Sequence, residues 1–309
     1  MTALREAAEG YLAIRRGLGY KLKIEGRMLR QFTGFCDTRG LEHVTTAAAL
    51  AWATTPADAD VSWWAARLTV IRKFAQFLAT FDARTQIPPT DLLPRTGKDR
   101  TQPHLYSPEQ IAALLKAARN LAHPLRAATF EALIGLMATT GIRTGEAMGL
   151  DRDDADLASG VLMIRGTKFG KSRLVPLHAT TIEHLVAYQQ QRDQLCPRPP
   201  TTAFFLSSTG TRLNSTSTSK AFTRILKTAA ITVPAGIANP RLYDLRHTFA
   251  VTTLASWYAA EADVGHLLPT LSTYLGHISP ATTYWHLHAC PQLMTEAVKR
   301  LEASWKDPS

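Results

Sequence analysis

Apolar residues recur at intervals near 3.6 positions along most of the chain, which predicts a mostly helical protein. Four short helices are expected before residue 85, and a longer series follows after residue 105. The clearest apolar stripe in the first series is formed by Trp64, Leu68, Ile71, Phe74, Phe77 and Leu78. The expected helices span residues 3–17, 24–39, 46–55, 61–81, 107–120, 124–140, 179–193, 215–230, 243–260, 265–275, 280–287 and 291–305.

A single stretch of the chain breaks the helical pattern. Residues 161–164 (VLMI) and 173–177 (RLVPL) are β-prone runs, and they flank the turn-rich sequence GTKFGKS. Two such runs on either side of a turn predict a hairpin or a small sheet. We therefore expect a small antiparallel sheet inside an otherwise helical domain.

Proline content and the loss of periodicity mark a boundary between two domains. Residues 86–104 contain four prolines, a composition typical of an interdomain linker. A helix-start signal follows, because Ser107 can cap a helix, Pro108 suits its first position and Gln110 can complete the capping box. The sequence therefore predicts a helical domain at 1–85, a linker at 86–104 and a second domain at 105–309.

The composition is that of a globular protein. The chain has 309 residues, of which 45% are hydrophobic and 19% are charged, and this length allows two domains with separate cores. No apolar run reaches the roughly 18 to 20 residues that cross a bilayer, and the N-terminus lacks the apolar core of a secretory signal. We expect a cytoplasmic protein that does not engage a membrane.

The cysteines and the short motifs exclude several kinds of site. Cys36, Cys196 and Cys290 lie far apart without a CxxC pair, which excludes a disulfide scaffold and a zinc knuckle. The sequence has no Walker A motif, no GxGxxG before a helix, no HExxH and no EF-hand loop. No metal ion or cofactor is expected.

The net charge of +10 favours a polyanionic partner. The excess is shared equally between residues 1–103 and 104–309, so it is not confined to a tail, and a basic surface over two folded units suits duplex DNA. In the first domain, basic residues are concentrated at the first helix break and on the second helix. They form either a solvated helix face or a face that contacts phosphates. These residues are Arg15, Arg16, Lys21, Lys23, Arg27 and Arg30.

Four stretches of the second domain carry the candidate chemistry. They are ATTGIRTGEAMGL (138–150), GTKFGKSRLVPL (166–177), LYDLRHTFAVTTL (242–254) and YLGHISPATTYWHLH (274–288). In order and spacing they resemble the conserved boxes of the tyrosine recombinases, also called the phage integrase family, over about residues 105–305. The first domain is similar, less specifically, to the helical core-binding domain of that family.

The resemblance implies a metal-free centre that breaks and rejoins DNA strands. It assigns Arg143 and Arg246 to the scissile phosphate, whose added negative charge two permanently protonated guanidinium groups can hold. It assigns Lys168 to protonation of the departing 5′-oxygen, with Lys171 as an alternative donor on the same hairpin. His277 would donate to the phosphate or help accept the proton of the nucleophile.

Three other residues belong to the same expected site. Glu146 would orient a neighbouring group, and Arg173 would contact DNA. Tyr243 stands shortly before Arg246, where the family usually has a histidine. Its hydroxyl can still donate a hydrogen bond to a phosphate oxygen, but it cannot carry the charge of a protonated imidazole.

The nucleophile position departs from the family pattern. In the family the attacking tyrosine follows the Leu-Gly-His histidine by nine residues, and the ninth residue after His277 is His286. Tyr284 lies two positions earlier, about 200° away around a helix, so it cannot simply take over. A metal site built from His277, His286 and His288 is not expected, because nearby carboxylates are absent and a cationic site would repel the ion.

Three interpretations of His286 stay open. In the first, the chain is a variant whose nucleophile has been replaced, so that the reaction stalls on DNA. In the second, the natural protein has lost cleavage and only binds or bends DNA. In the third, His286 or a displaced Tyr284 is the attacking group, since neutral imidazole is nucleophilic.

Together these observations predict a mainly α, two-domain DNA clamp, with an all-α N-terminal core-binding domain and an α-rich catalytic domain that holds a small antiparallel sheet. The resemblance implies site-specific recombination of double-stranded DNA through a covalent 3′-phosphotyrosine, as in integration or transposition of a mobile element, here in a cleavage-defective form. A non-catalytic DNA-binding or architectural protein and a type IB topoisomerase-like enzyme are the alternatives.

The C-terminal segment 293–306 is amphipathic, with Leu293, Val298, Leu301 and Trp305 on its apolar face. Such a face either packs on its own domain or, as is usual in the family, docks on a neighbouring protomer. The second possibility predicts a DNA-bound dimer or tetramer.

Overall fold

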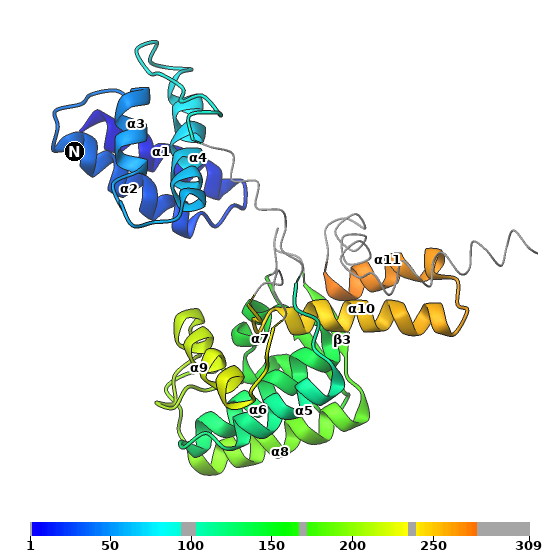
Figure 1. The fold of residues 1–309 in the computed structure, drawn as a ribbon. Helices are drawn as coiled ribbons and strands as arrows, with labels where there is room; N and C mark the ends of the chain where they lie inside the picture. Colours follow the sequence, from blue (N-terminus) through cyan, green and yellow to red (C-terminus); the bar gives the residue numbers. More distant parts are fainter. Residues whose placement is uncertain (1, 94–102, 167–171, 234–238, 277–309) are drawn as a thin grey trace, which may run out of the picture. The chain divides into compact units, whose positions relative to one another are not determined.

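The computed structural model describes residues 2–93, 103–166, 172–233 and 239–276, and it divides the chain into two compact units, Met1–Arg100 and Thr101–Ser309 (Figure 1). Each unit has its own hydrophobic core. The two units are therefore described one at a time.

The first unit is a small helical bundle. Its helices are α1 (Ala3–Gly17), α2 (Lys23–Asp37), α3 (Thr46–Ala53) and α4 (Val61–Leu78). The side chain of Thr45 accepts from the Ala48 N–H at the start of α3, and that of Asp60 accepts from the Ser62 N–H at the start of α4. Such caps satisfy amide groups that the helix itself leaves unpaired. The core is formed by side chains that face inward from all four helices, including Leu12, Leu29, Phe32, Trp52, Ile71 and Phe74.

The segment after α4 packs back onto the first unit. The Gln86 N–H donates to the Val44 carbonyl over 2.8 Å, and the Arg72 guanidinium donates to the carbonyls of Pro88 and Pro89. Leu92 and Leu93 contact the core of the same unit. Residues 86–93, the first part of the predicted linker, thus lie against the helices that precede them.

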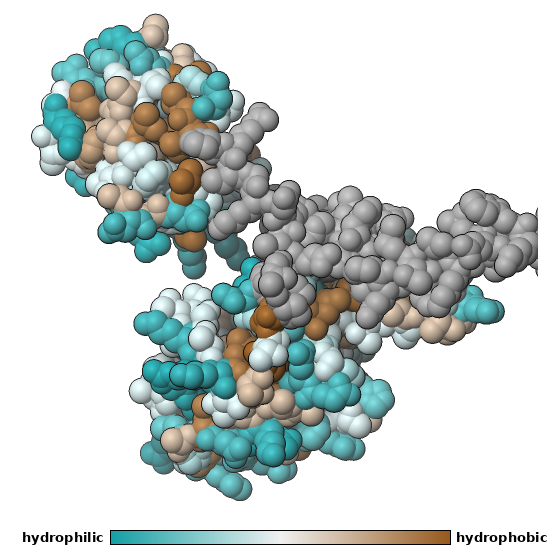
Figure 2. Space-filling model, viewed as in Figure 1, coloured by the Kyte–Doolittle hydropathy of each residue, from teal (hydrophilic) through white to brown (hydrophobic). Residues whose placement is uncertain are grey.

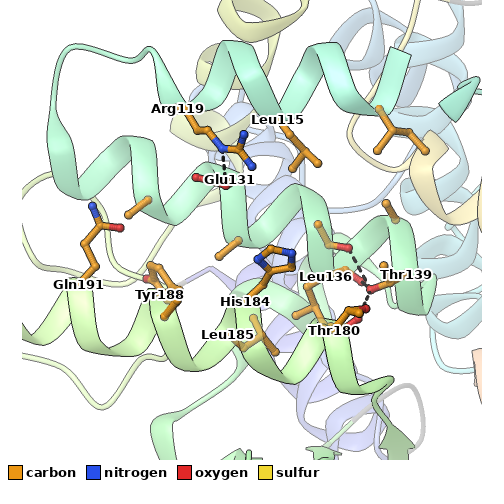
Figure 3. A pocket seen from close by; sticks show the side chains of 17 residues that line it. Leu115, Arg119, Glu131, Leu136, Thr139, Thr180, His184, Leu185, Tyr188 and Gln191 are labelled. Atoms are coloured by element: carbon orange, nitrogen blue, oxygen red, sulfur yellow. Dashed lines mark hydrogen bonds and ion pairs between the residues drawn. The ribbon is translucent and has the colours of Figure 1, made fainter. Parts of the chain in front are cut away.

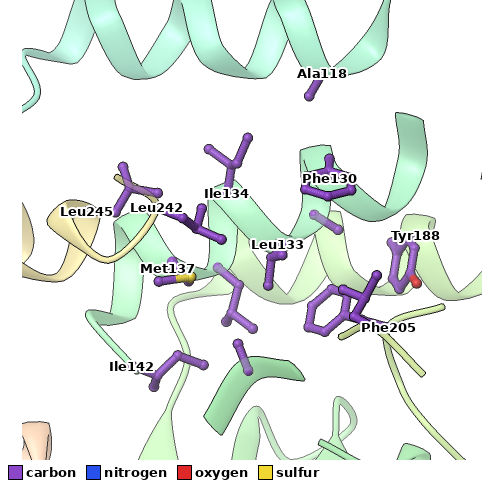
Figure 4. Packing of buried hydrophobic residues seen from close by; sticks show 14 of the residues in the cluster. Ala118, Phe130, Leu133, Ile134, Met137, Ile142, Tyr188, Phe205, Leu242 and Leu245 are labelled. Carbon is purple, nitrogen blue, oxygen red and sulfur yellow. The ribbon is translucent and has the colours of Figure 1, made fainter. Parts of the chain in front are cut away.

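The second unit is built around one buried helix. Its helices are α5 (Pro108–Arg119), α6 (Pro124–Thr140), α7 (Thr144–Gly149), α8 (Ala179–Leu195), α9 (Ser215–Thr228), α10 (Asp244–Ala259) and α11 (Val264–Leu275), with a short 3-10 turn η1 (Arg152–Asp154). Helix α6 contacts α5, α8 and α10, and most of its residues are buried because these neighbours cover most of its surface. Figure 4 shows Leu133, Ile134 and Met137 of α6 packed at the centre of this core.

A small sheet closes one side of the second unit. Strands β1 (Ala155–Asp156), β2 (Val161–Ile164) and β3 (Arg173–Pro176) form an antiparallel sheet in that order. Leu162 pairs with Val175 and Ile164 pairs with Arg173. Leu162, Ile164 and Val175 are buried, so the sheet turns one apolar face to the core. The register places Arg173 at the end of β3 nearest the predicted lysine hairpin.

The predicted fold class is confirmed, since the structure is mostly helical and carries a small antiparallel sheet. Residues 3–17, 124–140 and 161–164 were predicted with the bounds that the structure gives, and most other helices end within three residues of the prediction. The sequence reading missed α7, η1 and β1, which are too short to show a period. The helices expected at 280–287 and 291–305 lie outside the described residues.

The exposed surface is mostly polar on the face shown in Figure 2, with apolar patches on both units. Ile14, Leu18 and Ile24 are among the large apolar side chains exposed on the first unit. Among the helices that the structure describes, none is long and apolar enough to cross a membrane.

Candidate functional site

Three arginines and one glutamate converge in the second unit from three parts of the chain. Arg143 immediately precedes α7, Glu146 lies in the first turn of α7, Arg173 begins β3 and Arg246 lies in the first turn of α10. Hydrogen bonds join Glu146 to Arg143 and to Arg173, and Arg246 donates to the backbone just before Arg143. This arrangement is called the arginine cluster below.

The backbone before Arg143 is shaped by a glycine. Helix α6 ends at Gly141, which has a φ of +60°, a conformation that residues with a Cβ rarely adopt. A Cβ at this position would also lie 2.5 Å from a ring carbon of Phe249 on α10. The glycine therefore lets the chain leave α6 close to α10, which brings Arg143 beside Arg246.

Glu146 holds two of the arginines. Its Oε1 accepts from Arg143 Nη1 over 2.6 Å and from Arg173 Nη1 over 3.0 Å, and its Oε2 accepts from Arg173 Nη2 over 2.8 Å and from the Arg143 main-chain N–H over 3.0 Å. Burial alone would raise the pKa of this carboxyl, but the hydrogen bonds from Arg173 and Arg143 outweigh it and lower the pKa to about 2. Glu146 is therefore ionised at neutral pH.

Arg246 is fully buried, which is rare for a guanidinium group. Its Nη1 donates to the Gly141 carbonyl and its Nη2 to the Leu275 carbonyl, each over 2.7 Å, whereas its Nε has no acceptor within the described part of the chain. Burial, and then the charge of Arg143, lower its pKa to about 10. The group stays protonated at neutral pH, with one buried donor available for an additional acceptor.

The end of α11 is held by all three arginines. Arg173 Nε donates to the Tyr274 carbonyl over 2.9 Å, Arg246 Nη2 to that of Leu275 over 2.7 Å and Arg143 Nη2 to that of Gly276 over 2.5 Å. Cations at a helix C-terminus are favourable because the unpaired carbonyls carry partial negative charge. The cluster therefore fixes the backbone directly before residue 277.

The charges of the cluster do not cancel. Three guanidinium groups face one carboxylate, and in the ranges that the structure describes no second carboxylate forms an ion pair with them. Arg143 keeps 31% of its side chain exposed, while Arg173 keeps 12% and Arg246 none. An excess of two positive charges around a buried, unpaired donor is suited to binding an oxyanion.

Tyr243 and His247 lie beside Arg246 on α10. The Tyr243 side chain is 37% exposed at the start of the helix, and its ring contacts that of His247 edge-on with centroids 5.1 Å apart. Burial, followed by the charges of Arg241 and Arg246, lowers the pKa of His247 to about 4. The ring of His247 is therefore neutral at pH 7.

The structure brings together five of the residues that the sequence singled out. They are Arg143, Glu146, Arg173, Tyr243 and Arg246. Lys168, Lys171, His277, Tyr284 and His286 lie outside the described residues, and their expected roles stay predictions. The guanidinium of Arg173 is directed at Glu146 and the end of α11, and its expected contact with DNA stays a prediction.

The basic residues of the first unit lie on α1, on α2 and in the turn between them. Arg30 pairs with Glu9 over 2.6 Å, and Arg15 stacks over the ring of Tyr20. Arg16, Lys21, Lys23 and Arg27 are exposed. The first unit thus presents a basic surface, as the sequence predicted from the charge alone.

The sequence reading overlooked the exposed face of α9. Helix α9 contains no acidic residue, and its exposed positions carry hydroxyl and basic side chains. They are Ser215, Thr216, Ser219, Lys220, Thr223, Arg224, Lys227 and Thr228. The hydroxyl and basic residues are visible in the sequence STSTSKAFTRILKT. The helix was predicted from its apolar residues, however, and these form its buried face.

A groove of about 290 Å³ lies elsewhere in the second unit, between α5, α6 and α8 (Figure 3). Its walls are mostly apolar, and Arg119 and Glu131 form an ion pair across 2.6 Å at its edge. None of the residues that line it belongs to the arginine cluster. Within the described ranges, no group of three or more His, Cys, Asp or Glu side chains is placed to hold a metal ion.

Comparison with known proteins gives a consistent result. The model of the phage integrase family matches residues 105–292. The protein y4rB of Sinorhizobium fredii, assigned as an integrase or recombinase, is 44% identical over 99% of both chains. The tyrosine recombinase XerC of a Roseiflexus species is 31% identical over 72% of this chain and 67% of its own length.

Solved structures share the fold. The integrase of the transposon Tn1549, in complex with a circular intermediate DNA, superposes with a TM-score of 0.64 over 97% of this chain and 100% of that chain, at 16% identity. The site-specific recombinase XerH, bound to its DNA substrate in a post-cleavage complex, gives a TM-score of 0.61 over 91% of this chain and 78% of that chain, at 20% identity.

Proposed function

Because the chain belongs to the phage integrase family, we propose that it is a site-specific DNA recombinase that holds the scissile phosphate of duplex DNA between Arg143 and Arg246. The observation that carries the proposal is the arginine cluster, with its two uncompensated positive charges and the free Nε of the buried Arg246. A phosphodiester supplies two non-bridging oxygens, which share one negative charge and can accept from these donors.

The proposed reaction displaces one strand end at phosphorus. In the active form, a nucleophile at position 286 bonds to phosphorus and gives up its proton to His277, while the bond from phosphorus to the 5′-oxygen breaks and that oxygen takes up a proton from Lys168. Charge builds on the non-bridging oxygens, where preorganised guanidinium donors have their largest effect. The 5′-hydroxyl of a second strand then reverses the step, so that neither ATP nor a metal ion is consumed.

The remaining contacts with DNA would come from surfaces outside the cluster. The exposed hydroxyl and basic side chains of α9 form a face without negative charge, which suits hydrogen bonding to a DNA groove and its phosphates. The basic surface of the first unit would add phosphate contacts. In this proposal the two units close around the duplex, and segment 293–306 joins neighbouring protomers.

His286 makes a cleavage-defective form the function that we favour for this chain. A tyrosine at this position would yield a 3′-phosphotyrosine, whose phenolate leaves readily when the strand is rejoined. A histidine would yield a phosphorus–nitrogen bond with different leaving-group behaviour. The alternative, which His286 also supports, is a member of the family that binds or bends DNA and does not cut it.

The test uses the full chain and a duplex with a nick beside the cleavage position, so that a covalent adduct is trapped. The binding site is first selected from random DNA with the wild-type protein, and EDTA is present throughout. We expect no covalent adduct with the wild type and an adduct with H286Y. The double variant Y284F/H286Y should form the same adduct, because Tyr284 is not the attacking group. An adduct with the wild type would reject the cleavage-defective form. Failure of H286Y on a site that it binds would reject strand cleavage.

A further inference from the structure

We propose that Arg173 is a positioning residue for Arg143, because it occupies Glu146 and so keeps the guanidinium of Arg143 available for phosphate. This inference rests on the proposed function and deepens it. It also gives Arg173 a different role from the direct DNA contact that the sequence suggested.

Glu146 has all its acceptor positions in use. A carboxylate offers about four acceptor positions, two on each oxygen. Arg173 uses one on each oxygen in a two-pronged contact, the Arg143 side chain uses one on Oε1, and the Arg143 main chain uses one on Oε2. With Arg173 in place, Glu146 is therefore saturated.

Arg143 would gain a second bond to Glu146 if the two acceptor positions used by Arg173 became free. Arginine and carboxylate groups favour the two-pronged geometry, and Arg143 Nη1 already lies 2.6 Å from Oε1. Glu146 is only three residues further along the chain and is 9% exposed, so water competes little for its oxygens. Without Arg173, the guanidinium of Arg143 can turn its second donor to Oε2, and that donor is lost to phosphate.

Arg143 is the arginine that a ligand would meet first. Arg143 has the most exposed side chain of the three arginines, so it is the member of the cluster that meets a ligand arriving from solvent. Its position depends on contacts at both ends of the guanidinium, to Glu146 and to the Gly276 carbonyl. A donor that must move between two anionic partners binds phosphate less tightly than one already held in place.

The charge of Arg173 must be separated from its geometry. R173K keeps the positive charge but loses the planar fork, so it cannot cover both oxygens of Glu146. E146Q removes the negative charge that would capture Arg143. If Arg173 acts through Glu146, R173K should weaken phosphate binding when Glu146 is present and should have little effect on it in the E146Q background.

The experiment is a double-mutant cycle of wild type, R173K, E146Q and R173K/E146Q, with R165K as matched control. Arg165 follows β2 and forms an ion pair with Asp154 outside the cluster. The dissociation constant of inorganic phosphate is measured by thermal-shift titration on the chain with His286 retained. The adduct rate is measured separately for the same variants in the H286Y background.

We expect R173K to weaken phosphate binding roughly tenfold, a coupling usual within one ion-pair network, and to have less than about a twofold effect in the E146Q background. R165K should behave as the wild type. If R173K lowered phosphate affinity equally in both backgrounds, Arg173 would have a general structural role and the proposal would be overturned. The proposal would also be overturned if R173K lowered phosphate affinity in neither background.

The two readouts separate the two proposals. If H286Y forms no adduct while the phosphate cycle shows coupling, strand cleavage fails and the role of Arg173 stands. If H286Y forms adduct at the same rate with and without R173K, the role of Arg173 fails and strand cleavage stands. The conservative R173K keeps the charge, and circular dichroism checks that each variant is folded.

Discussion

Replacing Gly276 by alanine tests whether the guanidinium groups of Arg173 and Arg143 lie against the end of α11. Gly276 has a φ of +68°, and a Cβ at this position would lie 2.6 Å from Arg173 Nη1, 2.8 Å from Arg173 Cζ and 3.2 Å from Arg143 Nη1. The first two separations are shorter than any tolerated contact. The alanine must therefore displace the Arg173 guanidinium from Glu146 or unwind the end of α11.

The expected cost has two parts. A left-handed backbone with a Cβ costs about 1 kcal/mol relative to glycine. Weakening the charge-assisted hydrogen bonds of Arg173 adds about 2 kcal/mol, the usual value for one such bond. We expect G276A to destabilise the second unit by about 3 kcal/mol in total, by these two contributions.

The matched control is G166A. Gly166 lies in the same unit with a φ of +56°, but no atom of the described residues, apart from its chain neighbours, lies within 4 Å of a Cβ built there. It should show only the backbone cost of about 1 kcal/mol. Hydrogen exchange of the most protected α6 amides reports the unfolding free energy of the second unit for both variants. If G276A costs no more than G166A, the guanidinium groups do not lie against Gly276 and the geometry of the cluster is wrong.

Two further predictions concern pH and backbone strain. In the native state the pKa of His247 is about 4, whereas in the unfolded chain it is near 6.5. The free energy of unfolding should therefore fall by on the order of 3 kcal/mol as the pH drops from 6.5 to 4. Acid titrations followed by circular dichroism should show this loss in the wild type and not in H247Q. Glu146 has a pKa of about 2 in the native state, so the free energy of unfolding should fall further below pH 4.5, and E146Q should remove this second loss. A free energy of unfolding that stays constant from pH 6.5 to 2 would contradict both assignments. Ala230 and Glu261 follow the C-caps of α9 and α10 with positive φ angles of 51° and 54°. Because glycine adopts such angles without strain, A230G and E261G should each raise the unfolding free energy by about 0.5–1 kcal/mol in the hydrogen-exchange experiment. A loss of stability would show that these residues are not strained.

Much of the fold could be predicted because the local signals agree. Pro124 begins α6 and Gly141 ends it, with an apolar stretch between them, so both ends of that helix were visible in the sequence. Helix α7 was missed because its six residues, TGEAMG, begin and end near glycine and are too few to show a period. Its start is instead fixed by the Glu146 side chain, which accepts from the Arg143 N–H.

The site was only partly visible for a different reason. Motif order identified Arg143, Glu146, Tyr243 and Arg246, but a motif does not show which groups touch. Arg173 reaches Glu146 across 27 positions of the sequence and the Tyr274 carbonyl across 101, so nothing near it in the chain indicates either partner. The special role of Gly276 follows from the same contacts.

The central claim is that the arginine cluster activates a DNA phosphate, and the adduct rate of H286Y with and without Arg246 tests it most directly. On a nicked duplex carrying the selected site, H286Y and H286Y/R165K should form adduct at the same rate. H286Y/R246A should lose roughly a hundredfold or more, as when one oxyanion donor is removed from an active site, while DNA affinity changes little because other phosphate contacts supply most of it. If H286Y/R246A forms adduct as fast as H286Y, the cluster is not the phosphate-activating site.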